Sequence, residues 1–261
     1  MFDSHAHYND ERFEGIADSL INEIHNAGVE KITNIGASLK SSESSLELAK
    51  KFDFVYASVG VHPSDAVEDM KNPDWLDRLE QMYKSSEKVV AIGEIGLDYY
   101  YGKDETEEQK ICFEKQMQLA EKLGAPVIIH DRDAHEDTLE ILKRYPSVKG
   151  VLHSFSGSFE MAKQILEMGY YFSVNGVVTF NNARKIVDIL CRIDELAPYA
   201  RERILMETDC PYLAPVPFRG KTNRSDYMEY TAAKAAECLG ITPEEFCELT
   251  YNNACRLYCL K

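Results

Sequence analysis

The sequence is poor in positive charge. Its 261 residues include 29 Lys and Arg against 44 Asp and Glu, which gives a formal net charge of −15 at pH 7. A protein that binds nucleic acid over a broad surface carries a basic patch or stripe, so this balance argues against a large electrostatic footprint for DNA or RNA. Any phosphate-bearing substrate must therefore be held by a few local contacts.

The sequence also lacks long apolar runs and paired cysteines. No run reaches the roughly 18 apolar residues of a membrane span, and the chain begins MFDSHAHYND rather than with a basic and then an apolar stretch. We therefore expect a cytoplasmic protein without membrane association. The seven cysteines form no C-x-x-C pair, and Cys238, Cys247, Cys255 and Cys259 cluster near the C-terminus. This usage predicts reduced, buried thiols rather than disulfides or a zinc knot.

Short apolar runs alternate with longer amphipathic segments along the whole chain, the pattern of a parallel sheet with helical crossovers. Eight strands are expected, at Met1 to Ser4, Lys31 to Ile35, Phe54 to Val59, Lys88 to Ile92, Pro126 to Ile129, Val148 to Leu152, Tyr170 to Val174 and Arg203 to Met206. Helices are expected between them at Gly15 to Ala27, Leu39 to Lys50, Asp74 to Lys84, Thr106 to Leu123, Ala134 to Lys143, Glu160 to Glu167 and Ala183 to Cys191.

Eight strands that each precede a helix predict a closed (β/α)8 TIM barrel, because closure leaves no edge strand unpaired. The length is close to the roughly 250 residues typical of this fold. Two extra C-terminal helices are expected at Asp226 to Cys238 and Pro243 to Leu260, the second capped by Thr242. No linker or repeat interrupts the pattern, which predicts one domain over residues 1–261.

Ligand-type side chains stand where the expected strands end. His5 and His7 follow the first strand, and alternation lets both face one side. The other such residues are Glu94 after the fourth strand, His130 after the fifth, His153 after the sixth and Asp209 after the eighth. The C-terminal ends of barrel strands form the active site in this fold, so the positions predict a shared centre.

A single histidine beside an apolar run is most often structural, so only the histidines taken together indicate a metal site. Of seven histidines, five follow expected strands, and only His25 and His135 fall on expected helices, where we interpret them as surface residues. Imidazole with carboxylate suits zinc, iron, manganese or nickel, and a carboxylate-rich site suits magnesium, which leaves the metal open. Six ligands exceed the need of one tetrahedral ion, so we expect two divalent ions, with Glu94 as the bridge.

Several stretches together resemble the TatD family of metal-dependent deoxyribonucleases, within the amidohydrolase-like barrels. They are FDSHAHYND at the start, GVHP at residues 60–63, AIGEIGLDYY at 91–100, VIIHDRDA at 127–134, HSFSGS at 153–158 and ETDCPYLAPVPFRGKTNR at 207–224. The resemblance covers essentially the whole chain. It implies that His5, His7, Glu94 and Asp209 hold one ion, that Glu94, His130 and His153 hold the second, and that His62 lies near the substrate.

The chain departs from the family pattern at a few positions. The family usually has Thr and Leu where Ser4 and Tyr8 stand, and Pro-Glu where Ser225 and Asp226 stand. No expected ligand is lost. Without the proline, the loop after Arg224 is expected to be looser, which weakens the case for substrate contacts there.

Substrate contacts are expected from loops near the strand ends. The segment Val216 to Arg224 supplies Arg219, Lys221 and Arg224 without an acidic residue, and Arg132 follows His130 closely. Arg219 and Arg132 offer planar forks for phosphate, whereas Lys221 and Arg224 are as readily interpreted as solvated loop residues. Three consecutive tyrosines, at positions 99, 100 and 101, could stack on unpaired bases, although we expect at least two of them to pack the loop.

These residues predict a hydrolase that uses a metal-activated water, with Asp209 and Glu94 as its catalytic carboxylates. The resemblance implies a deoxyribonuclease of the 3′–5′ exonuclease type that acts on single-stranded DNA or 3′ ends, and no obligate protein partner is expected. A metal-dependent hydrolase of amides, lactones or small phosphoesters is the alternative enzyme, since related barrels use similar centres on many substrates. A non-catalytic metal-binding module is the alternative of another class, but six ligands exceed a closed structural site.

Overall fold

The computed structural model describes residues 1–260, and the chain divides into two compact units. The central unit comprises Asn34–His153. The terminal unit combines Met1–Thr33 with the chain from Ser154 onward, so it contains both ends of the chain. The division follows no linker.

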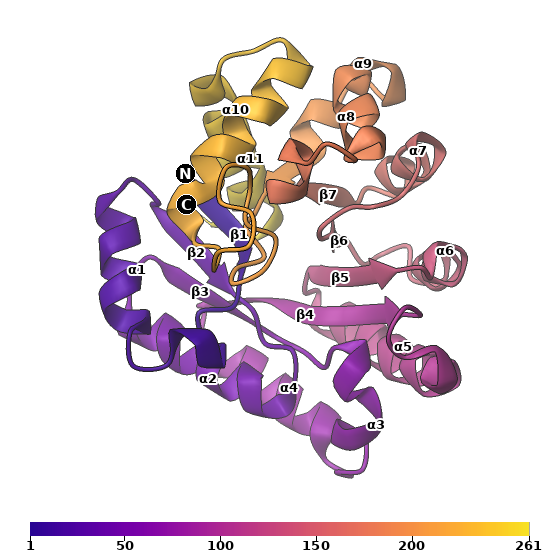
Figure 1. Ribbon diagram of the computed structural model, residues 1–261. Coiled ribbons are helices and arrows are strands. Elements are labelled where there is room, and N and C mark those ends of the chain that lie inside the picture. The colour runs from indigo at the N-terminus through magenta and orange to yellow at the C-terminus, as the bar shows by residue number, and fades with distance from the viewer. Residues whose placement is uncertain (261) are drawn as a thin grey trace. The chain divides into compact units, whose positions relative to one another are not determined.

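The strand order, β1 to β8 in chain order, and the alternation with helices are those of the (β/α)8-barrel fold class, as the sequence predicts (Figure 1). The strands are β1 (Phe2–Ala6), β2 (Lys31–Asn34), β3 (Val55–Val59), β4 (Val89–Asp98), β5 (Val127–Arg132), β6 (Gly150–Leu152), β7 (Tyr171–Val174) and β8 (Ile204–Met206). All eight predicted strands are present. β4 and β5 continue beyond their predicted ends, so Glu94 and His130 lie inside strands instead of after them.

The predicted helices are all present within one to three residues of their expected bounds. The α-helices are α1 (Ala17–Asn26), α2 (Leu39–Lys51), α3 (Ala66–Asp69), α4 (Trp75–Ser85), α5 (Thr106–Leu123), α6 (His135–Arg144), α7 (Phe159–Glu167), α8 (Arg184–Cys191), α9 (Ile193–Leu196), α10 (Met228–Leu239) and α11 (Pro243–Leu257). Short 3-10 helices occur at η1 (Glu11–Phe13), η2 (Pro63–Asp65), η3 (Lys103–Glu105), η4 (Gly176–Thr179), η5 (Ala200–Arg203) and η6 (Ser225–Tyr227). α3 and α9 were not predicted, because a single turn shows no helical period.

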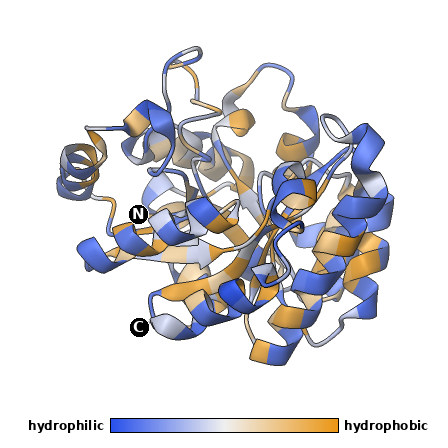
Figure 2. Cartoon of the chain, turned by 90° about the horizontal axis from the view of Figure 1, so that it is seen from below, coloured by the Kyte–Doolittle hydropathy of each residue, from blue (hydrophilic) through white to orange (hydrophobic). Residues whose placement is uncertain are grey.

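Local sequence explains where the long helices begin and which face they bury. Thr242 caps α11 through the backbone N–H of Glu245, whose side chain in turn accepts from the Thr242 backbone, and Pro243 occupies the first helical position as expected. Along the helices, hydrophobic and hydrophilic residues fall in separate stripes, while the strands are mainly hydrophobic (Figure 2). The apolar stripes bury against the strands, which is the main source of helix stability in a domain of this kind.

In the terminal unit, the end of the chain packs on its beginning. β7 and β8 pair in parallel, and Ala6 of β1 forms an isolated parallel bridge with Cys210 after β8. α11 contacts both β1 and β8 (Figure 1). Phe2 of β1 stands edge-on to the ring of Tyr251 in α11. The predicted C-terminal helices are therefore part of the core that holds β1 in place.

In the central unit, β3, β4, β5 and β6 pair in parallel in that order. The register between β4 and β5 shifts between Gly93 and Ile95, so Glu94 stands at an irregularity of the ladder. Gly96 has φ +141°, and a Cβ there would lie 2.0 Å from the carbonyl oxygen of His130. Only glycine permits this close approach, which brings the ends of β4 and β5 together.

The remaining predictions on single residues have mixed outcomes. All seven cysteines are free, but only Cys112 and Cys210 are buried, so the expectation of buried thiols was wrong for the other five, which are half-buried or exposed. His25 is exposed near the end of α1, and His135 is half-buried at the start of α6. Within residues 1–260, no helix combines the length and apolarity of a membrane span.

Candidate metal centre

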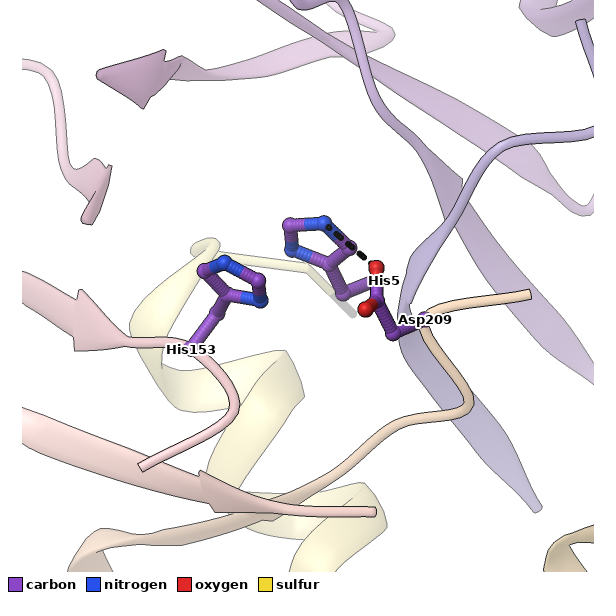
Figure 3. Close-up of side chains that lie close together, drawn as sticks. All are labelled: His5, His153 and Asp209. Atoms are coloured by element: carbon purple, nitrogen blue, oxygen red, sulfur yellow. Dashed lines mark ion pairs between the residues drawn. The ribbon is translucent and has the colours of Figure 1, made fainter. Parts of the chain in front are cut away.

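The terminal unit gathers three of the predicted ligands. The Nε2 atoms of His5 and His7 lie 3.1 Å apart, and Asp209 Oδ1 lies 3.6 Å from His5 Nε2 and 3.5 Å from His7 Nε2. Figure 3 shows the His5–Asp209 pair as a dashed line. His5 is fully buried, whereas His7 and Asp209 are partly accessible. Two imidazoles and one carboxylate therefore converge on one point at the rim of the core.

Backbone contacts explain why Asp209 meets the two histidines. The Asp209 N–H donates to the His5 carbonyl, and the His7 N–H donates to the Cys210 carbonyl, so the segment after β8 runs beside the end of β1. Asp209 itself has φ +56°. Aspartate is among the few residues with a side chain that adopt this left-handed conformation readily, and such residues cluster at functional sites.

Asp3 holds the backbone at His5 and Thr208, next to the His5–His7–Asp209 cluster. It lies two residues before His5, fully buried, and accepts hydrogen bonds from the N–H of His5, the N–H and hydroxyl of Thr208 and the hydroxyl of Ser225. Burial raises the pKa of Asp3 to about 6, against the lowering effect of these four donors. Sequence analysis did not identify this residue. The only available signal was an acidic residue two positions before an H-x-H pair, on the same side of the strand.

The central unit gathers the other three predicted ligands. His153 Nε2 lies 2.8 Å from Glu94 Oε1, His130 Nδ1 lies 2.9 Å from the same oxygen, and the two imidazole nitrogens are 3.1 Å apart. Glu94 comes from β4, His130 from the neighbouring strand β5, and His153 directly follows β6. Three adjacent strands thus direct one carboxylate and two imidazoles to a common point.

The electrostatics of this cluster favour an ionised carboxylate. Burial by itself would raise the pKa of Glu94, but electrostatic interaction with the rings of His153 and His62 and the hydrogen bonds from His130 and His153 hold that pKa well below its usual range. Burial lowers the pKa of His130, while hydrogen bonds to Asp98 and Glu94 raise it and prevail. An anionic oxygen surrounded by imidazoles is a site at which a cation can take the place of a proton.

Two further side chains adjoin the central cluster. His62 Nε2 lies 3.7 Å from Glu94 Oε1, and its ring stands edge-on to that of His130. Burial lowers the pKa of His62 to about 3, so it is neutral near pH 7. Asp98 Oδ2 lies 3.2 Å from His130 Nε2, the ring nitrogen opposite the one that faces Glu94. Asp98 was not among the predicted site residues, because the predicted fourth strand ended at Ile92. In the structure β4 continues to Asp98.

Both clusters have the donors of a divalent-ion site, and in each the two imidazole nitrogens have a suitable separation. Two atoms each about 2.1 Å from one ion are about 3.0 Å apart at an octahedral angle and about 3.4 Å apart at a tetrahedral angle. The 3.1 Å separations of His5 from His7 and of His130 from His153 fall in this range. Potential ligand atoms of His62, Glu94 and His130 also lie within 4.8 Å of one another. Asp98 behind His130 is the carboxylate partner that metal-bound imidazoles usually have.

The four predicted cationic substrate contacts differ in how far their charges are already neutralised. Arg224 pairs with Glu23 at 2.7 Å and with Asp226 at 2.6 Å. Arg219, which is exposed, lies over the ring of Phe180 at 3.7 Å, and Lys221 lies over Phe218 at 5.3 Å.

The fourth, Arg132 in the central unit, lies over Tyr100 and Tyr101. Because Arg224 already pairs with two carboxylates, it is less available to a phosphate than Arg132 or Arg219.

The loop after Arg224 is held by side chains in place of a proline. The Ser225 hydroxyl donates to Asp3, and the Ser225 N–H donates to the Tyr8 hydroxyl at 3.0 Å. The Tyr8 and Ser225 hydroxyl oxygens are 2.6 Å apart. These contacts do not support the looser loop expected from the absence of proline. Two of the positions that depart from the family pattern contact each other.

The chain matches a known protein family over nearly its whole length. The family model described as TatD related DNase matches residues 2–259. YabD, an uncharacterized metal-dependent hydrolase of Bacillus subtilis strain 168, is 40% identical over 99% of this chain and 98% of its own. YcfH, an uncharacterized metal-dependent hydrolase of Escherichia coli K12, is 35% identical over 99% of this chain and 95% of its own.

Among solved structures, YjjV, a TatD homologue from Escherichia coli K12, superimposes with a TM-score of 0.91 at 29% identity and covers 100% of this chain and 98% of its own. A phosphotriesterase homology protein from Escherichia coli, at 14% identity and a TM-score of 0.71, shares the fold alone. The family match over nearly the whole chain and the two hydrolase relatives agree with the ligand clusters. The chain belongs to the TatD family of metal-dependent hydrolases.

Proposed function

We propose that this protein is a metal-dependent deoxyribonuclease that removes nucleotides from the 3′ end of single-stranded DNA. The observation that supports the proposal most directly is the pair of ligand clusters, His5–His7–Asp209 and Glu94–His130–His153, each with interatomic spacings suited to a divalent ion. In this proposal one ion is held by each cluster, and Glu94 serves both. The donor set accommodates Zn, Mn, Fe, Ni or Mg, with mixed nitrogen and oxygen ligands favouring the first four.

The proposed chemistry is hydrolysis of a phosphodiester, in which water attacks phosphorus, the bond from phosphorus to one ester oxygen breaks, and that oxygen leaves with a proton. A divalent ion held by these residues would supply Lewis acidity, which lowers the pKa of water and polarises the phosphoryl oxygen. The Asp209 carboxylate, whose Oδ1 faces both histidines, is positioned to orient the attacking water and to accept its proton. Glu94 is kept ionised by its imidazole neighbours and so remains a ligand over the neutral pH range.

Arg132 and Arg219 are the proposed phosphate contacts, since neither guanidinium has a carboxylate partner among the described residues. Lys221 would add a weaker contact from the same loop as Arg219, and His62, neutral beside Glu94, would face the substrate or complete the ligand set. Few cations are available in a chain with a net charge of −15, so only a few phosphates can be contacted.

The test is a hydrolysis assay on metal-stripped protein reloaded with each divalent ion in turn. Substrates are single-stranded DNA with a plain or a phosphorothioate-blocked 3′ end, duplex DNA, bis(4-nitrophenyl) phosphate, a lactone and an amide. Activity on the plain strand that is lost with the blocked 3′ end supports the proposal. His130→Ala should abolish it, and His25→Ala, at an exposed helix position, should not.

Other outcomes of the same assay contradict the proposal in different ways. Preference for the lactone, the amide or the small phosphodiester would make the protein a hydrolase of small molecules. Metal binding without hydrolysis of any substrate would favour a non-catalytic module. Cleavage that ignores the 3′ block would retain the nuclease and reject the exonuclease.

A further inference from the structure

The loop between β4 and α5 presents two exposed aromatic rings at a fixed position. Tyr100 is 58% exposed and Tyr101 is 76% exposed, and their rings meet edge to face with centroids 4.7 Å apart. Tyr99, in contrast, is half-buried, and its hydroxyl donates to Asp137. Only one of the three tyrosines therefore packs the loop, where at least two were expected.

The exposed rings are anchored by a buried carboxylate. Asp98, the last residue of β4, accepts hydrogen bonds from the N–H groups of Tyr100 and Tyr101 on its Oδ1, both at 2.9 Å. Gln109 closes the loop from α5 by donating to the carbonyls of Asp98 and Gly102. These hydrogen bonds hold the backbone of the loop, while both rings remain exposed. Preorganised exposure of large apolar groups is typical of a binding surface.

The same carboxylate connects the rings to the candidate metal centre. Asp98 Oδ2 lies 3.2 Å from Nε2 of His130, whose Nδ1 faces Glu94. Arg132 follows His130 by two residues on β5, and alternation places both side chains on one side of that strand. The tyrosine pair, Arg132 and the ligand His130 thus belong to one set of side chains within the central unit.

Arg132 gives the surface its chemical character. Its guanidinium lies 4.0 Å from the ring centroid of Tyr100 and 4.7 Å from that of Tyr101. Among the described residues it makes no hydrogen bond or ion pair, whereas Arg12, which stacks on Tyr212, also pairs with Asp10. A guanidinium with unused donors over two rings that remain largely exposed matches a group that is flat and apolar on one side and anionic on the other. A nucleobase with its phosphate has this form.

We propose that Tyr100, Tyr101 and Arg132 form a stacking subsite for an unpaired nucleobase and its adjacent phosphate. This inference rests on the proposed function, since it identifies how a single strand would be engaged at the metal centre. A paired base is stacked between its neighbours and cannot offer its face, so the subsite selects single strands or frayed ends. It also explains how so acidic a chain can bind a polyanion, because stacking requires no net positive charge.

The test is binding of single strands in a chelator, where no cleavage occurs. Fluorescein-labelled octathymidylate is compared with an octamer of abasic residues, which has the same phosphates and no bases. The wild type should bind the octathymidylate about 5- to 150-fold more tightly, the factor that corresponds to about 1–3 kcal/mol for one stacked base. The variant Tyr100→Ala/Tyr101→Ala should lose most of this preference.

Two matched variants separate stacking from other effects. Tyr100→Phe/Tyr101→Phe keeps both rings and should keep the preference. Tyr199→Ala removes an exposed tyrosine of the terminal unit and should also keep it. Thermal melting checks that each variant is folded. Equal binding of both octamers by the wild type, a preference that survives the double alanine variant, or no binding of octathymidylate would each overturn the subsite.

Failure of the subsite and failure of the proposed function give different results. If the base preference is present in chelator but no divalent ion supports cleavage of DNA, the subsite stands and the nuclease is rejected. If DNA is cleaved from its 3′ end but the two octamers bind equally, the nuclease stands and the subsite is rejected.

Discussion

The contact between Tyr8 and Ser225 offers a sharp test of how the terminal unit is held together. The two residues are separated by 217 positions in the sequence, and both side chains are buried, with relative exposures of 2% and 0%. The Ser225 hydroxyl donates to Asp3, so the Tyr8 hydroxyl donates to Ser225 Oγ and accepts from the Ser225 N–H. A proline at position 225, as in the family pattern, would present neither group.

Replacing Tyr8 by Phe removes one hydroxyl and leaves the buried N–H of Ser225 without an acceptor. An unsatisfied buried donor costs about 1–3 kcal/mol, so Tyr8→Phe should lower the free energy of unfolding by about that amount. In a Ser225→Pro background the donor is absent and the buried Tyr8 hydroxyl has lost both of its Ser225 partners, so Tyr8→Phe should be neutral or stabilising. The backbone can accept this proline, because Ser225 is the first residue of η6 and Arg224 before it is extended.

The four proteins of this cycle should therefore show a coupling energy of at least about 1–3 kcal/mol. Urea unfolding in the presence of a chelator measures it without a contribution from bound metal. Circular dichroism is the suitable probe, because the single tryptophan, Trp75, lies in α4 of the central unit. An equal cost of Tyr8→Phe in both backgrounds would refute the reasoning, since the hydroxyl would then not act through Ser225.

Three further predictions concern the metal centre and the substrate. Glu94→Ala should lower the content of both ions after dialysis, whereas His153→Ala should mainly lower the content of one ion, as measured by elemental analysis. Wild-type metal content in Glu94→Ala would show that Glu94 is not a bridge. Asp98→Ala should weaken metal affinity about 10- to 100-fold in chelator competition, because His130 loses its orienting carboxylate; an unchanged affinity would leave Asp98 as a loop anchor only. Arg219→Ala should raise the KM for DNA and flatten the salt dependence by less than about one unit while sparing small phosphoesters. A wild-type salt slope typical of six or more phosphate contacts would instead reveal a basic groove.

The amino-acid sequence determined the elements and their order. The apolar runs and helical periods are local properties, and α5, for example, spans Thr106–Leu123 as predicted. The ligand-type residues could be chosen because strand ends are visible in the sequence. The distances now support the groupings His5–His7–Asp209 and Glu94–His130–His153 within each unit.

Tertiary structure decided what surrounds those ligands. The extension of β4 to Asp98 depends on its pairing with β5, so no local pattern could show that Asp98 reaches both His130 and the tyrosine loop. The hydrogen bonds of Thr208 to the buried Asp3 and the neutralisation of Arg224 by Glu23 also join residues far apart in the sequence. A sequence shows which side chains are present and which way a strand alternates, but register and packing decide which charges meet. For that reason the candidate ligands could be chosen from the sequence, while the carboxylates beside them and the exposed tyrosine pair could not.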